Sequence, residues 1–421
     1  MDFAMLARKQ MFVTSLWFVD LILLLVTVAF LLFKYQTRKF DHWKRKGVFH
    51  LKPIPFFGNA YDLCTYKQNM GPWFKTIYNS VNKPFFGIFI FDKPLLVVKS
   101  PDLIKQILVR DFNTFSGRMI LSPKHDQLFL NMMFIHKGTD WKKMSPIFTS
   151  GKLKGMFEII NNAGLDMNKY IKKNLGQLES KEICSKYSTD VIAACAFAIR
   201  AHSFENENAD FRKIGESDTL YFLGHPAVNI LRLNFFDSWT TNYLASAFWK
   251  TIKIREESGT KGNDLIDIII NMRKDKELCE EIDFEGVKVV AQAVQFFAAG
   301  FETTSSTMAF MLYELCLHPD MQDKLRQEIM DSIKNNNGIT YEGISEMKYL
   351  DMCVMETLRM YPVLPFIDRK CDADYKIPGT DVVLDKGTPV VIPMLGLHYD
   401  EKYFPKPDEF NPERFTNKKI F

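Results

Sequence analysis

The sequence predicts a mainly helical protein with small β-sheets, behind a single membrane-spanning helix at its amino terminus. Three observations support this: an apolar stretch near the start, apolar residues at helical spacing over residues 101–358, and short β-prone runs flanking that region. The chain has 421 residues, 47% of them apolar and 25% charged. This is enough for a large core, and we expect one helix-rich domain behind the anchor.

The amino-terminal apolar stretch covers residues 11–33 and carries one charge, Asp20. Crossing the hydrocarbon core of a bilayer takes about 20 residues, so the stretch is long enough. A cleaved signal peptide is the alternative, yet no small-x-small cleavage site follows Phe33. Basic residues are more numerous after the stretch, which predicts a cytosolic carboxy-terminal side; they are Lys34, Arg38, Lys39, Lys44, Arg45 and Lys46, against Arg8 and Lys9.

A basic, proline-containing segment at residues 34–59 follows the predicted anchor. Proline fixes its own φ and keeps the residue before it out of the helical region. We therefore interpret 34–59 as a stiff hinge, with an ordinary loop as the alternative. The predicted organisation is an anchor at 1–33, a hinge at 34–59 and the main domain at 60–421.

Two β-prone runs at residues 85–91 and 94–99 are separated by Asp92-Lys93, which suits a hairpin. Strand-like segments return near 375–377 and 388–393. Between these regions the helical spacing is interrupted by Asn and Gly at 335–338.

Charge and cysteine content exclude several classes of protein. The net charge of +4 is small, and no segment carries the dense Lys/Arg stripe of a nucleic-acid binder. The cysteines are odd in number and none forms a Cys-x-x-Cys pair; they lie at positions 64, 184, 195, 279, 316, 353 and 371. This pattern predicts free thiols rather than a disulfide framework or a zinc site.

A long helix is predicted between a cap at Asp283 and a stop at His318-Pro319. Its middle combines Ala299 and Gly300 with Glu302 and Thr303, and Ala299 and Gly300 lie one turn before Thr303 on the same face. Small residues there would let a flat ligand approach the backbone, with an acid and a hydroxyl placed to pass protons. The alternative is that the hydroxyl groups only bond back to the preceding turn.

Two further motifs lie downstream. Glu356 and Arg359 are three residues apart on one predicted helix face, before a stop at Tyr361-Pro362. A Pro-Glu-Arg-Phe phrase then supplies Arg414. Alone, a Glu/Arg pair is a common surface feature, but a pair on a largely apolar helix needs further partners.

With these motifs in this order, the chain resembles the cytochrome P-450 monooxygenases. The resemblance covers the sequence from the anchor to Phe415. The resemblance implies the cytochrome P-450 fold, an α-rich domain with small β-sheets. It implies that Thr303, with Glu302 beside it, supplies protons during dioxygen activation, and that Glu356, Arg359 and Arg414 form a structural ion network behind the haem. Residues 145–154 are most similar to the insect detoxification and vertebrate drug-metabolising branch.

The same resemblance implies a set of haem contacts. Ala299, Gly300 and Thr303 would lie against the haem, Arg118 and Arg369 would bind its propionates, and Trp141 would donate a hydrogen bond to a propionate. For each of these last three, a surface arginine or a core tryptophan is the alternative. By helical position, Phe296 and Phe297 are candidates for the substrate pocket wall, and equally for ordinary core.

The implied chemistry is insertion of one atom of O2 into lipophilic small molecules by haem b iron. Electrons would come from NADPH through NADPH-cytochrome P-450 reductase, with cytochrome b5 as a further partner. The implied location is the endoplasmic reticulum membrane, with the catalytic domain facing the cytosol.

Two departures from the family pattern are visible. The family usually has an arginine four residues after the tryptophan, where this chain has Ser145, and about one helical turn is missing there. The family's cysteine loop follows the Pro-Glu-Arg-Phe phrase, whereas this sequence ends at Phe421. We therefore expect no metal ligand within the chain and no turnover by it as written.

Three functions remain open at this point. The first is a working haem monooxygenase of which this is an incomplete form. The second is a truncated, non-catalytic membrane-bound isoform that binds apolar ligands or the reductase. The third is a membrane-tethered helical binding module. It would not explain why the Glu302-Thr303 pair occurs together with Glu356, Arg359 and Arg414.

Overall fold

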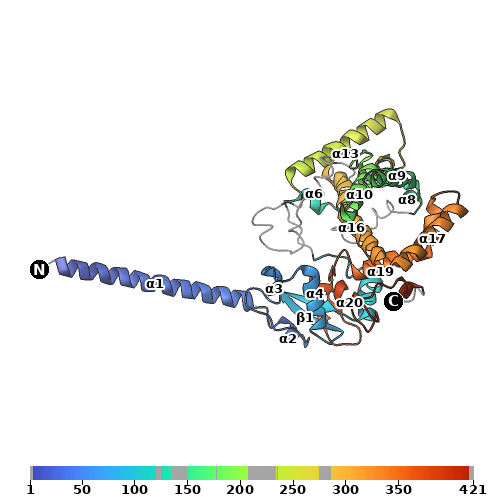
Figure 1. The fold of residues 1–421 in the computed structure, drawn as a ribbon. Coiled ribbons are helices and arrows are strands. Elements are labelled where there is room, and N and C mark those ends of the chain that lie inside the picture. The colour runs from blue at the N-terminus through green and yellow to red at the C-terminus, as the bar shows by residue number, and fades with distance from the viewer. Residues whose placement is uncertain are drawn as a thin grey trace. The chain divides into compact units, whose positions relative to one another are not determined.

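A computed structural model describes residues 3–119, 125–133, 150–176, 178–206, 234, 236–274 and 286–416. The chain forms two compact units (Figure 1). Unit 1 comprises Met1–Phe115 and Pro365–Leu397, and unit 2 comprises Ser116–Leu364 and His398–Phe421. The prediction of a mainly helical protein with small sheets is confirmed.

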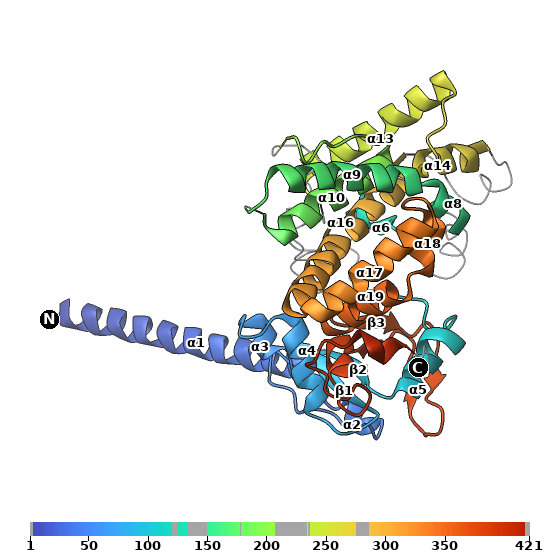
Figure 2. The ribbon, with the colours of Figure 1, turned by 45° about the vertical axis from the view of Figure 1, so that its right-hand side comes forward.

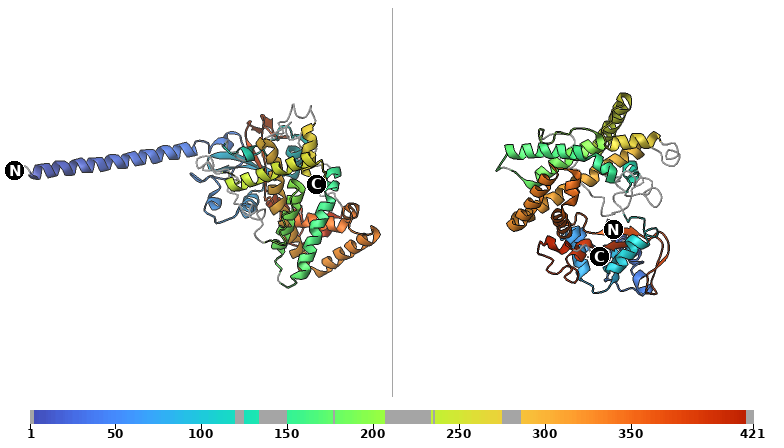
Figure 3. Two further views of the ribbon diagram at one scale, coloured as in Figure 1. Left: turned by 90° about the horizontal axis from the view of Figure 1, so that it is seen from above. Right: turned by 90° about the vertical axis from the view of Figure 1, so that its right-hand side faces the viewer.

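Unit 1 begins with the helix α1 (Phe3–Thr37), which extends away from the rest of that unit (Figure 3). Its part from Trp17 to Thr37 has a mean hydropathy of 2.3 and is long and apolar enough to cross a membrane. The large apolar side chains from Trp17 to Phe33 are exposed. Such a surface is unfavourable in water, so the finding agrees with the predicted anchor.

The sheet of unit 1 has four strands in the order β1-β2-β6-β3. The predicted hairpin is present, with β1 (Phe85–Ile90) antiparallel to β2 (Lys93–Val98) and Phe85 opposite Val98. The strand β6 (Pro389–Ile392) runs parallel to β2, with Leu96 opposite Val390. The strand β3 (Ile367–Lys370), which the sequence did not suggest, is antiparallel to β6.

The remaining elements of unit 1 are short. They are α2 (His42–Arg45), α3 (Tyr61–Cys64), α4 (Met70–Asn79), α5 (Pro101–Lys105), a π-helical turn (Gln106–Arg110) and the two-stranded sheet β4 (Tyr375–Lys376) with β5 (Val383–Leu384). The helix α20 (Met394–His398) ends one residue past this unit.

The segment after α1 is packed onto the sheet. Trp43 is fully buried, and its Nε1 donates to the carbonyl oxygen of Ile88 at 3.2 Å. Its ring fills the space in which any side chain at Gly87 would lie, so this strand position requires glycine. Further along, Asn59 donates its backbone N–H to Phe89 at 2.6 Å. Residues 43–59 are thus fixed to β1 through a buried tryptophan and backbone hydrogen bonds.

Unit 2 is helical, and Figure 2 shows α10 beside the long helix α16. Its helices are α6 (Gln127–Leu130), α8 (Ser150–Gly155), α9 (Phe157–Lys173), α10 (Ser180–Phe197), α13 (Ser238–Ser258), α14 (Leu265–Lys274), α16 (Gly286–Leu317), α17 (Pro319–Asn335), α18 (Tyr341–Glu346), α19 (Lys348–Met360) and a 3-10 turn, η4 (Pro412–Phe415).

Several helix boundaries follow from local sequence. The Asp237 side chain accepts a hydrogen bond from the N–H of Thr240 at 2.7 Å and caps the start of α13. This helix ends at Ser258 and is followed by Gly259 in a left-handed conformation. The predicted stop at His318-Pro319 is confirmed, since α16 ends at Leu317. The predicted cap at Asp283 lies outside the described residues.

Candidate functional site

The predicted ion network is assembled in unit 2, where Glu356 is fully buried in α19. Arg359 donates from Nε to Glu356 Oε2 at 2.7 Å and from Nη2 to Oε1 at 2.9 Å. Arg414, from η4, donates from Nε to Oε1 at 3.2 Å. The same Oε1 accepts the backbone N–H of Asn411 at 2.9 Å. The carboxylate therefore has donors for both oxygens, as a buried charge requires.

The remaining guanidinium donors reach backbone carbonyls. Arg359 donates to His398 at 2.9 Å, and Arg414 donates to Pro405 and, at 2.6 Å, to Lys406. His398 returns a contact from Nδ1 to the carbonyl of Arg359 at 3.1 Å. Burial lowers the pKa of His398 to about 4, so its ring is neutral at pH 7. The network thus fixes the segment 398–414 to α19.

The predicted acid and hydroxyl pair lies at the middle of α16. Thr303 Oγ1 donates to the carbonyl of Ala299, the back-bonded arrangement that the sequence left open as the alternative. Glu302 is exposed, and its Oε1 accepts from Ser306 Oγ at 3.0 Å. The Thr303 hydroxyl and the Glu302 carboxylate therefore both form hydrogen bonds within α16, which rotation of their side chains can break.

Sequence reasoning did not find Lys181, which holds this patch from α10. Its Nζ donates to Glu302 Oε1 at 2.8 Å, to Ser305 Oγ at 3.0 Å and to Ser306 Oγ at 2.7 Å. Lys181 and Glu302 are 121 positions apart, so no local sequence signal could have indicated the contact. It orients the Glu302 side chain and sets a positive charge beside its carboxylate.

Helix packing explains the glycine at position 300. A side chain at this position would meet Ile192 of α10, and Ser188 Oγ, also from α10, approaches the carbonyls of Gly300 at 2.8 Å and Phe301 at 2.9 Å. Glycine thus lets α10 lie close against α16. Ala299, in contrast, is exposed, so it is the small residue of the pair that remains accessible.

The other predicted residues are spread over the two units. Phe297 is buried and stacks on Phe301 with ring centroids 5.8 Å apart, and Phe296 packs against the same apolar cluster. Arg118 is half-buried in unit 2. Arg369 lies in β3 of unit 1, opposite Val390. Trp141 and Ser145 lie outside the described residues.

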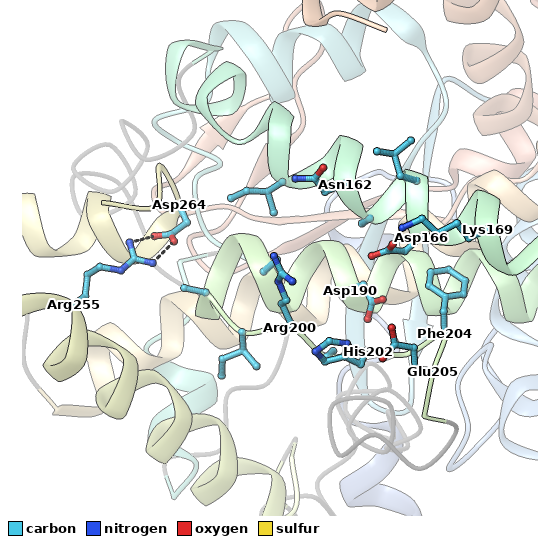
Figure 4. A pocket seen from close by; sticks show the side chains of 17 residues that line it. Asn162, Asp166, Lys169, Asp190, Arg200, His202, Phe204, Glu205, Arg255 and Asp264 are labelled. Carbon is cyan, nitrogen blue, oxygen red and sulfur yellow. Dashed lines mark hydrogen bonds and ion pairs between the residues drawn. The ribbon is translucent and has the colours of Figure 1, made fainter. Parts of the chain in front are cut away.

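A cavity of about 570 Å³ lies elsewhere in unit 2, lined by α9, α10 and residues 198–205 (Figure 4). Many of its charges are already paired: Lys169 with Asp166 at 2.9 Å, His202 with Glu205 at 3.2 Å and Arg255 with Asp264 at 2.8 Å. It contains none of the predicted site residues.

Comparison with known proteins decides the family. A family model described as cytochrome P-450 matches residues 50–421. The chain belongs to the cytochrome P-450 family. It is 39% identical to cytochrome P-450 6k1 and 37% identical to cytochrome P-450 6j1, both of Blattella germanica. These alignments cover 94% and 95% of this chain, and 82% and 83% of those proteins.

A third relative, cytochrome P-450 6a2 of Drosophila melanogaster, is 34% identical over 95% of this chain and 85% of its own length. The cytochrome P-450 family consists of haem-dependent monooxygenases that draw electrons from a redox partner and act on small molecules. By family, this protein is therefore a monooxygenase with a haem iron cofactor.

The haem of this family requires a deprotonated cysteine as its iron ligand. Burial raises the pKa of Cys195 and of Cys353 to about 12, and that of Cys371 to about 11. Cys371 Sγ donates to the carbonyl of Ala373 at 2.8 Å. A ligating cysteine needs a lowered pKa instead. Burial therefore disfavours, in these three cysteines, the thiolate form that an axial ligand requires.

Proposed function

We propose that this cytochrome P-450 inserts one atom of O2 into lipophilic small molecules as a haem-thiolate monooxygenase. When bound, the haem iron supplies the activation of dioxygen. Electrons come from NADPH through NADPH-cytochrome P-450 reductase, with cytochrome b5 as a further electron donor. The observation that carries the proposal is the pairing of Glu302 and Thr303 in mid-helix α16 of a chain with this family match.

The proton role belongs to Thr303 and Glu302. Thr303 Oγ1 now donates to the carbonyl of Ala299, so it must rotate off that oxygen before its proton can serve another acceptor. Because Ala299 is exposed and lacks a bulky side chain, a ligand has room beside that hydroxyl. Glu302 is the adjacent acid, and Lys181 and Ser306 hold its carboxylate in place.

The remaining assignments concern haem binding. Arg118 and Arg369 bind the propionates, since guanidinium groups form paired hydrogen bonds with carboxylates, and Trp141 donates a further bond. Ala299 and the backbone of Gly300 form the wall against which the haem lies, since the Cβ side of Gly300 faces Ile192, and Phe296 and Phe297 contribute to the pocket wall. Glu356, Arg359 and Arg414 keep the haem-side segment in place through the buried network.

We further propose that α1 anchors the protein in the endoplasmic reticulum membrane. The basic residues that follow the apolar stretch favour a cytosolic location for residues 60–421. In this organisation residues 1–33 are the anchor and 34–59 connect it to the catalytic domain.

The proton role is tested by Thr303→Ala in the chain extended by the family's cysteine loop, loaded with haem and supplied with the reductase and NADPH. We expect normal haem content, less product and more hydrogen peroxide for each NADPH consumed. The control is Thr304→Ala, which removes an exposed hydroxyl from the neighbouring position of the same helix. Equal partition between product and peroxide in both variants and the unmodified protein would contradict the role of Thr303.

The haem-thiolate assignment is tested by the carbon monoxide difference spectrum of the reduced protein. The 421-residue chain is compared with the same chain extended by a carboxy-terminal segment that carries the family's cysteine loop. We expect the far-red Soret band of a thiolate-ligated haem in the extended protein. Its absence there would refute the assignment, and its presence in the 421-residue chain would show that one of the chain's own seven cysteines reaches the iron.

A further inference from the structure

A mainly basic group of side chains lies together in unit 1 at the end of the sheet where β2 begins. Lys39 Nζ is 3.0 Å from Asp92 Oδ2, in the turn between β1 and β2. Lys93, the next residue, and Lys370 have no ion-pair partner among the residues that the structure describes. We call Lys39, Asp92, Lys93 and Lys370 the basic cluster.

Strand pairing brings two of these lysines to one edge of the sheet. Lys93 is the first residue of β2, and Lys370, the last residue of β3, is opposite Pro389, the first residue of β6. Because β6 runs parallel to β2, both strands begin at the same edge. With β6 alone between them, the β2 and β3 backbones are about 10 Å apart, so two lysine side chains can converge on one ligand.

The charges of the cluster do not balance. The cluster has three ammonium groups and one carboxylate, Asp92, which is paired with Lys39. Partial loss of solvent lowers the pKa of Lys93, Asp92 raises it, and the positive charges of Lys39 and Lys370 lower it further. An anion bound beside these lysines would relieve their mutual repulsion.

The cluster is fixed close to the end of the apolar helix. Lys39 is two residues beyond Thr37, the last residue of α1, a distance that the chain spans in at most about 7 Å. Beyond it, Phe40 packs on Phe89 with ring centroids 5.2 Å apart, and Trp43 is buried on β1. The turn that carries Asp92 and Lys93 is therefore held beside the membrane end of α1 by an ion pair and by core packing.

We propose that the basic cluster binds the headgroup of an anionic phospholipid in the leaflet from which α1 emerges. The inference rests on the proposed anchoring by α1, because the anchor brings the cluster to the bilayer surface. Lys93 and Lys370 contact the headgroup phosphate, and Asp92 keeps Lys39 oriented beside them. This contact restrains the sheet of unit 1 at the membrane, in addition to the tether that α1 provides.

Amine acetylation, mapped residue by residue with mass spectrometry, tests the proposal on the full chain in lipid nanodiscs. Discs of phosphatidylcholine alone are compared with discs that also contain phosphatidylserine. We expect Lys93 and Lys370 to react more slowly in the anionic discs only, and Lys105 and Lys376, exposed lysines of the same unit, to react equally in both. Equal rates for Lys93 and Lys370 in both discs would overturn the proposal.

The outcomes separate the cluster from the anchor. A chain that does not enter neutral discs refutes anchoring by α1, whereas a chain that enters both discs without protection of Lys93 and Lys370 refutes only the cluster. Protection of the same lysines in neutral discs by millimolar inorganic phosphate would show that a free anion, not a headgroup, is the ligand.

Charge-matched variants supply an affinity measurement. Detergent-solubilised full chain is titrated calorimetrically with dihexanoyl phosphatidylserine. Affinity should fall about fivefold for each lysine removed in Lys93→Gln and Lys370→Gln, which corresponds to about 1 kcal/mol per lysine. It should be unchanged in Lys105→Gln and Lys376→Gln. Equal losses in both sets of variants would reduce the effect to net charge and contradict a site.

Discussion

Unit 2 contains two groups of charged side chains, one around Glu356 and one around Glu302. They differ in burial and in the kind of hydrogen-bond partner. Around Glu356 every charged group is buried or nearly so, and two arginines and a backbone amide donate to one carboxylate. Around Glu302 the partners are a lysine and hydroxyl groups, and the Glu302 side chain is 62% exposed. Buried charges persist only when their bonds are fully satisfied, whereas the exposed patch can exchange its partners at little cost. The group around Glu356 is therefore suited to stabilising the fold, and the group around Glu302 is suited to a role in proton transfer.

The largest loss of stability should come from Glu356→Ala. Two guanidinium groups and the Asn411 amide would lose their acceptor, so we expect the free energy of unfolding to fall by about 3–5 kcal/mol. Urea unfolding followed by circular dichroism measures it. The control is Glu342→Ala, which removes an exposed partner of Lys154 and should leave stability nearly unchanged. Similar losses in the two variants would remove the contrast between buried and exposed pairs.

The pH dependence of the buried cluster should come next in size. His398 titrates at about 4 in the folded protein because burial disfavours its charged form, against about 6.5 when unfolded. Between these values the unfolded chain binds the proton, so stability falls as pH drops from 6.5 to 4. The loss amounts to at most about 3 kcal/mol. His398→Asn, which cannot take up the proton, should flatten this part of the curve, and an unchanged slope would contradict the assignment.

A smaller loss of stability is expected from a change at Gly300, where α10 packs against α16. In Gly300→Ala the added methyl meets Ile192, and we expect a loss of about 1–2 kcal/mol after the gain in helix propensity. Ile192→Val removes the δ-methyl group and should recover most of that loss in the double variant. A double-mutant cycle of unfolding free energies measures the coupling. Additive effects would show that this contact does not explain the glycine.

The smallest effect on stability should come from Lys181→Met. Its ion pair with Glu302 is largely exposed, so we expect less than about 1 kcal/mol. Under the proposed function this substitution should nevertheless increase the peroxide formed per NADPH in the haem-loaded, extended chain, because Glu302 loses its orienting charge. Lys181→Arg should preserve the peroxide yield, and Lys169→Met, which breaks an exposed pair on α9, is the control. Unchanged coupling would show that Lys181 does not position Glu302.

Local sequence was sufficient where the physical cause is local. The apolar run of α1, the hairpin around Asp92-Lys93 and the stop at His318-Pro319 each depend on neighbouring residues, and all three occur in the structure. The Glu356 and Arg359 pair also follows from spacing on one helix, while Arg414 was joined to it by resemblance to the family. The haem contacts stay predictions, and Trp141 lies outside the described residues.

By itself the sequence determined the helical class, the membrane-length helix and the family to which the chain belongs, because these depend on periodicity, hydropathy and ordered motifs. Only the tertiary structure decided that Lys181 holds Glu302, that Gly300 accommodates Ile192, and that Trp43 locks the segment after α1 onto β1. Such contacts join residues far apart in the chain, and their geometry depends on how helices and strands pack. No local pattern encodes that packing.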